Sequence, residues 1–514
     1  MDTSPSRRTV LQTIAASAVG SILLPSMTPT PTRAAALPSQ RLPRARPDEL
    51  GVDPAGILAF LTAIQSKGPA PHSMMLLRRG KVVAEGWWNP YAPEIPHTLY
   101  SLSKSFTSHA VGLAVSDGLL KTTDKVVSFF PGKLPAAVSQ NLAAISVHNL
   151  LTMSTGHDLE PDTIGDDWVR TFLAAPVKHT PGTHFLYNTA ATHVLAAIVE
   201  QLTKQSLTAY LTPRLFEPLG ILNPKWQTAP SGVTIGGYGL SLRTEDIAAF
   251  GQLYLQRGRW NDKQLIPESW IDLATATQVS NGDPATGNDW NQGYGYQFWR
   301  SAHDNYRGDG AFGQYCIVIP KHDAVLAMTS GASDMAMLLT AAWDHLLPAF
   351  DRAPSATPQA AAAALSSLEF PHPTGNHTSP LAKQISGKTW RFQPNDDKYT
   401  ALTLTFGPKS CQFSLAGTHG NLSADVGYQS WIRGVSPFQT GPRPAHLRTT
   451  WSSDPVAMSG AWTDESTFRV MACFYESPYV LTLDLSFRDN ELAVIRRYNV
   501  YFGASERPKL IAQG

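Results

Sequence analysis

The pattern of apolar and polar positions predicts mixed helices and strands in the first two thirds of the chain. Two apolar runs within residues 73–88, MMLLRR and KVVAEGWW, meet at Gly80 and predict a β-hairpin. Apolar residues recur at helical spacing after residue 101: Phe106, Ala110, Leu113 and Ala114. Helices are therefore expected at 101–120, 192–203, 244–256 and 333–347, and strands at 315–320 and 324–329. This order fits an antiparallel sheet built from both ends of one domain, with helices between.

The pattern changes near the C-terminus. Short alternating runs at 400–406, 467–474, 480–487 and 492–498 are separated by turn residues and predict a meandering sheet or small barrel. Residues 352–367 are rich in Ala, Pro and Ser and show no periodic apolar face, which is typical of a linker. We therefore expect an α+β fold with these parts: a flanked antiparallel sheet at 45–350, a linker at 351–377 and an all-β, barrel-like domain at 378–514.

Composition supports a folded protein and argues against a nucleic-acid binder. Of the 514 residues, 43% are hydrophobic and 16% are charged, which is too apolar for a disordered chain. The 41 Lys and Arg nearly balance the 40 Asp and Glu, so the formal net charge is +1. The basic excess that neutralises phosphates is missing.

The first 36 residues have the features of an export signal. Ser6 to Gln12 contains Arg7-Arg8 and is similar to a twin-arginine motif, and a moderately apolar run from Thr13 to Leu24 follows it. The run is shorter than the roughly 20 residues that span a bilayer, which argues against a membrane anchor. We predict cleavage after Ala36, a periplasmic or secreted protein, and no membrane span in the mature chain.

The cysteines do not indicate a disulfide framework. Cys316, Cys411 and Cys473 are an odd number, so at least one thiol is unpaired within the chain. Cys411 and Cys473 could pair, but we favour two thiols on separate buried strands.

The sequence Ser101-Leu102-Ser103-Lys104 is an S-x-x-K element at the start of a predicted helix. A serine in the first turn lies near unpaired helix N–H groups, and a lysine three residues later lies on the same face. In a buried cleft the lysine pKa would fall, and the neutral amine could take the hydroxyl proton. The alternative is a helix-capping Ser101 with a solvated Lys104.

The residues around this element resemble the active-serine helix of β-lactamase-related serine hydrolases. This group contains class C β-lactamases, D-alanyl-D-alanine peptidases, carboxylesterases and nylon-oligomer hydrolases. The resemblance covers about residues 47–350 and rests on these segments in the expected order: Leu99 to Pro131, His148 to Gly156, Pro181 to Thr203, Gly236 to Trp260, Gly293 to Trp299 and Arg307 to Pro320. It implies a β-lactamase/transpeptidase-like fold.

The resemblance also implies a second catalytic group. A tyrosine within Y-x-N assists the serine in this family, and here Tyr187-Asn188-Thr189 has Thr where Asn is usual. Either Asn188 or Thr189 would make the expected polar contact. A phenol beside an ammonium is stabilised as phenolate, so Tyr187 is expected to act as a base with Lys104. The alternative is a core tyrosine.

The family's K/H-x-G region is matched only loosely, by the stretch from Arg307 to Gln314. The best alignment puts Arg307 at the basic position and Gly310 where a backbone N–H joins that of Ser101 in an oxyanion hole. A Gly-rich turn with a solvated Arg307 is the alternative. We expect substrate to contact these residues: Asn188, Thr189, Arg307, Gln314, Trp168 and Tyr238.

Other catalytic signatures are absent from the sequence. There is no G-x-S-x-G elbow, no phosphate-binding loop, and no metal-ligand spacing among the fifteen histidines. We expect no cofactor and no metal. Tyr294, Tyr296 and Trp299 add aromatic residues to segments that line the cleft in the family, which favours a mostly apolar substrate.

The sequence therefore predicts an exported serine hydrolase that forms an acyl-enzyme on a small ester or amide. The absence of S-D-N favours the class C and esterase side of the family. Within it, the departures at Thr189 and Arg307 make a β-lactamase or D-amino-acid peptidase the second choice. A binding protein that retains the fold without activity is the third. The specific substrate, the oligomeric state and the purpose of the β-domain stay open.

Overall fold

The computed structural model describes residues 42–66, 71–418, 420–438 and 454–514. The predicted signal segment, residues 1–36, lies outside them. No helix in these ranges is apolar and long enough to cross a bilayer.

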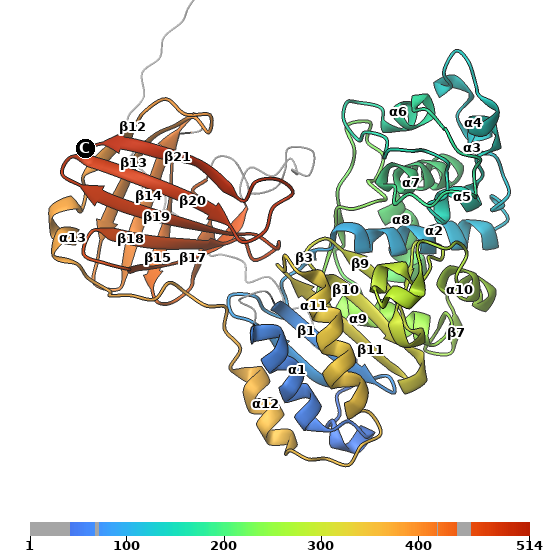
Figure 1. Cartoon of the computed structure of the whole chain (residues 1–514), viewed down its shortest axis with the longest axis horizontal. Helices are drawn as coiled ribbons and strands as arrows, with labels where there is room; N and C mark the ends of the chain where they lie inside the picture. The colour runs from blue at the N-terminus through green and yellow to red at the C-terminus, as the bar shows by residue number, and fades with distance from the viewer. Residues whose placement is uncertain (1–41, 67–70, 419, 439–453) are drawn as a thin grey trace, which may run out of the picture. The chain divides into compact units, whose positions relative to one another are not determined.

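An antiparallel sheet of six strands forms the centre of the first domain, in the order β2-β1-β11-β10-β9-β8 (Figure 1). The strands are β1 Pro71–Arg78, β2 Lys81–Trp87, β8 Trp299–Arg300, β9 Tyr306–Gly310, β10 Gln314–Ile319 and β11 Ala324–Ser330. Every residue of β1 and β11 is buried, which explains their continuous apolar runs, because both faces of the sheet are covered. The predicted hairpin at Gly80 and both predicted strands are confirmed.

Helices cover both faces of this sheet. Helix α1 (Pro54–Ser66), α11 (Met335–Ala341) and α12 (Pro358–Ser366) lie on one face, and α9 (Thr244–Leu255) packs on the other against β1, β10 and β11 (Figure 1). The remaining helices of the domain are α2 Ser103–Ser116, α3 Val126–Phe129, α4 Gln140–Ala144, α5 Val147–Leu151, α6 Trp168–Ala174, α7 Thr189–Thr203, α8 Leu207–Leu211 and α10 Glu268–Thr275. Four predicted helices thus correspond to α2, α7, α9 and α11.

Two smaller sheets complete this part of the chain. The first has the order β3-β5-β4, and the second pairs β6 with β7. Their bounds are β3 His97–Thr98, β4 Lys225–Trp226, β5 Leu240–Leu242, β6 Arg259–Trp260 and β7 Lys263–Gln264. Because β3 ends three residues before Ser101 and pairs with β5, it fixes the chain that leads into the nucleophile turn.

The segment predicted as a linker contains secondary structure. Helix α12 begins after Thr357, whose hydroxyl accepts a hydrogen bond from the N–H of Ala360. Its run of alanines has high helix propensity, and Ala361 is buried where α12 packs on α1 and β2. The domain boundaries stay a prediction.

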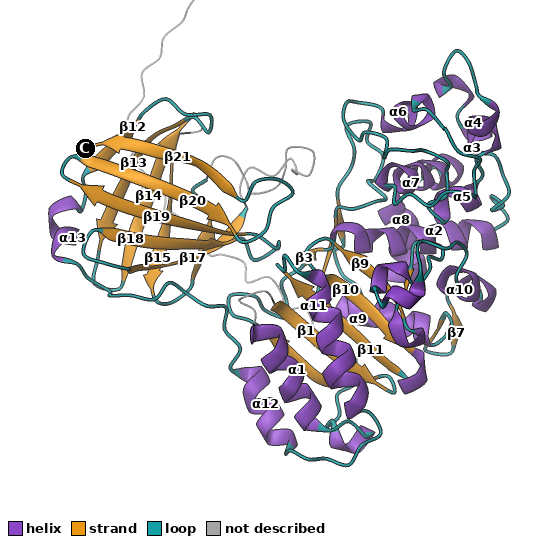
Figure 2. Cartoon of the chain, in the orientation of Figure 1, coloured by secondary structure: helices purple, strands orange, loops and turns teal. Residues whose placement is uncertain are grey.

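The C-terminal residues form a ten-stranded sheet after a short helix, α13 (Pro380–Ile385) (Figure 2). Its strands are β12 Thr389–Phe392, β13 Tyr399–Phe406, β14 Ser410–Gly417, β15 Gly420–Tyr428, β16 Ile432–Val435, β17 Pro455–Trp462, β18 Thr467–Cys473, β19 Val480–Arg488, β20 Glu491–Tyr498 and β21 Glu506–Gln513. A pairing of β15 with β17 closes the sheet, so the predicted barrel-like domain is confirmed.

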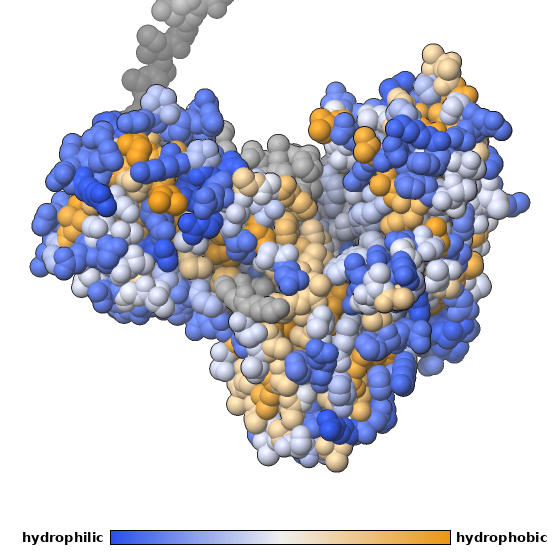
Figure 3. Space-filling view, in the orientation of Figure 1, coloured by the Kyte–Doolittle hydropathy of each residue, from blue (hydrophilic) through white to orange (hydrophobic). Residues whose placement is uncertain are grey.

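Buried residues alternate with more exposed ones along several of these strands, as β18 and β20 show. The outward residues give the strands a mostly hydrophilic surface on the face shown in Figure 3. Cys411 and Cys473 lie on β14 and β18 and are free, as is Cys316. The preference for separate buried thiols is confirmed.

Candidate active site

The S-x-x-K serine lies in a tight turn that leads into α2. Ser101 belongs to a 3₁₀ turn, Tyr100–Leu102, and Lys104 lies in the first turn of α2. Tyr100 has a φ of 47°, a left-handed conformation that a bulky side chain rarely adopts. Backbone strain of this kind persists only where the surroundings hold it, and it is concentrated at functional sites.

Lys104 connects the serine to the rest of the site. Its Nζ atom lies 2.9 Å from Ser101 Oγ, 2.8 Å from the carbonyl oxygen of Gly237 and 3.4 Å from Thr189 Oγ1. The side chain is 1% exposed, and burial lowers the pKa of Lys104 to about 7, although Glu160 and Asp309 act in the opposite direction. A neutral amine has two N–H groups for Gly237 and Thr189, which leaves its lone pair for the serine hydroxyl. This arrangement suits a general base.

Tyr187 lies beside the same amine. The Lys104 Nζ atom is 4.8 Å from the centroid of the phenol ring, which stacks on Trp299 at 5.3 Å. Burial raises the pKa of the Tyr187 phenol well above its usual value, and this outweighs the opposite effect of a hydrogen bond with Ser101. The structure therefore brings Tyr187 to the predicted position, but burial favours the neutral phenol over the expected phenolate.

Thr189, rather than Asn188, makes the polar contact that the third position of Y-x-N implies. Its hydroxyl lies beside Lys104 Nζ, and its backbone N–H donates to Glu160 Oε1 at 2.5 Å. Asn188 is fully buried and caps α7, where its Oδ1 atom accepts from the N–H of Ala191. Thr189 thus stands where asparagine is usual and contacts Lys104 through the hydroxyl of a shorter side chain.

Strand β9 approaches the serine turn through its glycines. A Cβ atom on Gly310 would lie 2.0 Å from the carbonyl oxygen of Leu99, and one on Gly308 would lie 2.5 Å from the Leu102 side chain. The two glycines alternate with Arg307 and Asp309, so one face of β9 lies against the turn and the charged side chains point the other way. Gly310 lies close enough for the predicted oxyanion role, which stays a prediction.

Arg307 is fully buried among neighbouring side chains. It is 0% exposed, and its Nε atom donates to Asp309 Oδ2 at 3.0 Å, while its remaining contacts include Ser301 and the ring of Trp290. Its alternating position on β9 explains why it does not reach the pocket. Gln314 is also buried and donates to the carbonyl oxygens of Ala311 and Ser330, so it supports the turn after β9. Neither residue lines the pocket that contains Ser101, and their predicted contact with substrate stays a prediction.

A pocket of about 410 Å³ opens over the serine. Such a volume fits a small organic molecule. Its walls are formed by Tyr100, Ser101, Glu160, Pro161, Asp162, Thr163, Ile164, Thr189, Tyr238, Ala311 and Phe502. Of the predicted aromatic contacts, Tyr238 lines the pocket. Trp168 lies behind the wall, where its Nε1 atom donates to the carbonyl oxygen of Gly165.

The comparison with known families agrees with this geometry. Residues 72–349, more than half of the chain, match the family described as Beta-lactamase. The chain belongs to the Beta-lactamase family. The predicted enzyme class, a serine hydrolase of this family, is confirmed.

Individual relatives are distant. A 6-aminohexanoate-dimer hydrolase from Paenarthrobacter ureafaciens is 25% identical over 51% of this chain and 73% of its own length. Among solved structures, a putative 6-aminohexanoate-dimer hydrolase from Bacillus anthracis has a TM-score of 0.50, with 20% identity over 61% of this chain and 89% of its own. A putative beta-lactamase from Bacteroides dorei has the same TM-score, with 16% identity over 58% of this chain and 99% of its own. These two structures confirm the β-lactamase-like fold.

Several residues of this Beta-lactamase-family site were not found by sequence reasoning. Glu160 and Asp309 raise the pKa of Lys104, and the carbonyl oxygen of Gly237 accepts a hydrogen bond from its amine. Ala311 and Phe502 line the pocket. Gly237 lies in a segment that resembles the family, but no pattern marks Glu160 or Phe502, because each comes from a loop whose position depends on the whole fold.

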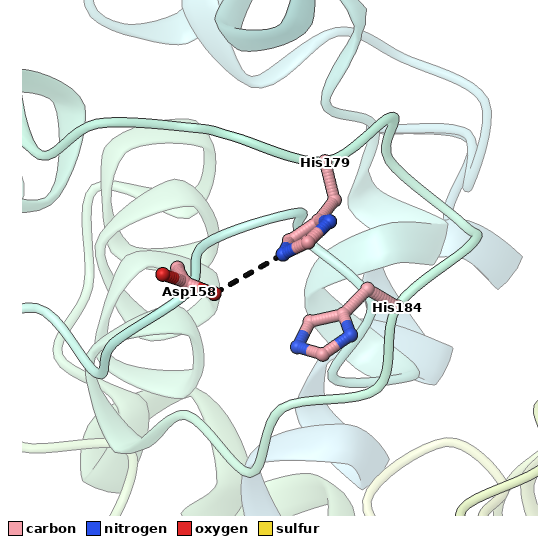
Figure 4. Close-up of side chains that lie close together, drawn as sticks. All are labelled: Asp158, His179 and His184. Atoms are coloured by element: carbon pink, nitrogen blue, oxygen red, sulfur yellow. Dashed lines mark hydrogen bonds and ion pairs between the residues drawn. The ribbon is translucent and has the colours of Figure 1, made fainter.

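One cluster outside the pocket has the residue types that bind metals. Ligand atoms of Asp158, His179 and His184 lie within 4.8 Å of one another (Figure 4). Two imidazoles and a carboxylate form a donor set that zinc accepts. However, the Asp158 carboxylate already accepts from Lys178 at 2.7 Å and from His179 at 3.2 Å, and the two imidazole rings stack at 4.2 Å. These contacts hold the segment that follows Gly156 against the segment that precedes Tyr187. The cluster therefore has a structural role.

Proposed function

We propose that this serine hydrolase cleaves an ester or amide bond in a small, mostly apolar substrate through an acyl-enzyme. The observation that carries the proposal is the contact between Nζ of the buried Lys104 and Ser101 Oγ. A lysine with a pKa of about 7 is neutral in half of the molecules near physiological pH, so it can accept the serine proton.

The first half of the reaction acylates the serine. Neutral Lys104 takes the proton of Ser101 as Oγ forms a bond to the carbonyl carbon, and the carbonyl oxygen becomes an oxyanion. The backbone N–H groups of Ser101 and Gly310 are the proposed donors to this oxyanion. When the tetrahedral intermediate collapses, the bond to the alcohol or amine breaks, and the leaving group takes a proton from Lys104.

The second half releases the acid. A water molecule replaces the leaving group, gives its proton to Lys104 and attacks the acyl carbon, and Ser101 recovers its proton. Since burial keeps Tyr187 protonated, we assign it a different role from the base expected from the sequence. Its neutral hydroxyl is hydrogen-bonded to Ser101 and orients the serine, while Lys104 carries the proton from Ser101 to the leaving group.

The charge of the pocket favours an uncharged substrate over a β-lactam. The described residues that line the pocket include Glu160 and Asp162 and no Lys or Arg. Arg307, at the aligned basic position, is held by Asp309. β-Lactams and D-amino-acid peptides carry a carboxylate, which two nearby carboxylates would repel.

A substrate with an amino group is a second candidate. An ammonium group would be attracted by Glu160 and Asp162 in the pocket wall. The relative named 6-aminohexanoate-dimer hydrolase acts, by its name, on a dimer of 6-aminohexanoate, which carries an amino group. An aminoacyl amide is therefore included among the test substrates.

The experiment compares initial rates on matched substrates, using wild-type protein and Ser101→Ala. The substrates are a p-nitrophenyl ester, an aminoacyl p-nitroanilide, a D-amino-acid amide and a cephalosporin. We expect the highest kcat/KM on the ester, or on the aminoacyl anilide for the second candidate, with no turnover by Ser101→Ala. Cephalosporin hydrolysis faster than ester hydrolysis would mean that the enzyme prefers β-lactams to esters, which contradicts the proposed substrate class. No turnover of any substrate, together with no covalent labelling of Ser101, would favour a non-catalytic binding protein.

The same proposal includes export of the folded protein through the twin-arginine route. Support comes from Arg7-Arg8, the apolar run after them and the small residues that end at Ala36. Fractionation of cells that produce the full chain tests it, with N-terminal sequencing of the exported product. We expect a periplasmic or secreted protein that begins at Leu37, and cytoplasmic retention when Arg7 and Arg8 are both replaced by Lys. An uncleaved cytoplasmic wild-type chain would contradict export.

A further inference from the structure

The C-terminal domain contributes a side chain to the catalytic pocket. Phe502, in the connection between β20 and β21, lines the same pocket as Ser101. Its side chain is 53% exposed. A single exposed phenylalanine is ordinary on a protein surface, but this one borders the cavity that contains the nucleophile.

A cluster of aromatic rings holds Phe502 beside the serine turn. The Phe502 ring lies 4.8 Å from that of Phe312 and 5.5 Å from that of Tyr100, measured between centroids. The Tyr100 ring packs edge-on against Phe312 at 5.7 Å. Ring separations of this size are typical of favourable aromatic pairs. The cluster therefore joins Tyr100, which directly precedes Ser101, and Phe312, which follows β9, to the C-terminal domain.

Hydrogen bonds fix the same contact. Tyr100 directly precedes Ser101 in the chain, and its hydroxyl donates a hydrogen bond to the hydroxyl of Tyr479 at 2.8 Å. The N–H of Thr98 donates to the carbonyl oxygen of Glu476 at 3.0 Å. Asn499, three residues before Phe502, donates to the carbonyl oxygen of Gly331 at 3.3 Å. The strained conformation of Tyr100 is thus held in part by the C-terminal domain.

The chemistry of the pocket limits what Phe502 can contact. Apolar surface on this side comes from Tyr100, Ile164 and Ala311 together with Phe502, and the charged groups on the wall are carboxylates. An uncharged aromatic or bulky apolar group would bury its surface against these side chains. Its carbonyl carbon would then lie near Ser101.

We propose that Phe502 forms an apolar subsite for an aromatic or bulky apolar group of the substrate, which makes the C-terminal domain part of the active site. This inference rests on the proposed hydrolase function and names the class of substrate group that the enzyme prefers. Phe502 is a specificity residue, since it lies against the substrate and takes no part in proton transfer.

The test measures selectivity in two ester series. One series keeps the p-nitrophenol leaving group and compares acetate with phenylacetate. The other series keeps the acetyl group and compares methyl acetate with benzyl acetate. We expect Phe502→Ala to lower the preference of kcat/KM for the aromatic member about tenfold in at least one series, and Phe502→Leu to lower it less.

Ile495→Ala is the matched control, because Ile495 is an exposed apolar residue on β20 that does not line the pocket. It should keep the wild-type preference, and thermal unfolding of each variant checks that the fold is intact. If the wild-type protein is active and folded Phe502→Ala keeps its preference in both series, the proposed subsite is wrong. The proposed hydrolase function would not be affected by that result. A wild-type chain that hydrolyses none of the esters would overturn the proposed function and the subsite together.

Discussion

Lys104 Nζ lies 2.9 Å from Ser101 Oγ, and the pKa of this buried lysine is lowered to about 7. Desolvation of the ammonium produces this shift, and it makes the amine a base at neutral pH. Two acceptors, the carbonyl oxygen of Gly237 and the hydroxyl of Thr189, orient the amine toward the serine. The nucleophile is thus activated by one residue from the same helical turn.

The pH dependence of the reaction should follow the protonation of Lys104. Its neutral form is the active one, so kcat/KM should rise about tenfold per pH unit below pH 7 and level off above it, with a midpoint at about 7. A pH profile on an uncharged ester, which does not titrate itself, measures this midpoint. A rate that falls as pH rises from 6 to 8 would contradict the assignment of Lys104 as the base.

Glu160→Gln should move that midpoint to lower pH. The Glu160 carboxylate raises the pKa of Lys104 by stabilising the ammonium, and its loss lowers that pKa. The Gln side chain keeps an oxygen that can accept from the N–H of Thr189. Asp162→Asn is the control, because Asp162 lines the same pocket but is not among the groups that shift Lys104. Equal shifts in both variants would mean that the general charge of the pocket, rather than Glu160, sets the midpoint.

Gly310→Ala should lower kcat/KM at least a hundredfold. The new Cβ atom would lie 2.0 Å from the carbonyl oxygen of Leu99, so the serine turn or β9 must move, and a displacement near 1 Å costs about this much. Gly434→Ala, on β16, meets no atom within 4 Å and should keep wild-type activity. Steady-state kinetics on both variants make the comparison. Wild-type kinetics in Gly310→Ala would show that the close approach is unimportant.

Arg307→Met should destabilise the fold by about 3 to 5 kcal/mol, because it leaves the buried Asp309 without its ion-pair partner. Burial already raises the pKa of Asp309, and Arg307 acts against this effect. Chemical denaturation measures the change. The double variant Arg307→Met, Asp309→Asn should recover more than half of the loss, since no buried charge remains. Wild-type stability in the single variant would contradict the buried ion pair and support the alternative of a solvated Arg307.

The parts of the site that depend on local spacing could be predicted from the sequence. Ser101 and Lys104 lie three residues apart on one helical face, and this spacing survives in any fold that keeps the helix. The strands and helices of the first domain were found for the same reason, because their apolar patterns are local.

The parts that depend on which face of a strand points inward could not be predicted. Arg307 occupies the aligned basic position, but Gly308 and Gly310 take the face of β9 that lies against the serine turn. The arginine therefore points to Asp309 on the opposite face. Phe502 was missed for a different reason: about 400 residues separate it from Ser101, so only the folded chain brings the two together.

Covalent labelling of Ser101 by a fluorophosphonate tests the central claim most directly. The probe needs an activated serine but no knowledge of the substrate, and peptide mass spectrometry locates the label. We predict complete labelling of wild-type Ser101, with a rate that rises through pH 7, and labelling at least a hundredfold slower in Lys104→Met. Labelling of Lys104→Met at the wild-type rate, or no label on wild-type Ser101, would contradict the account.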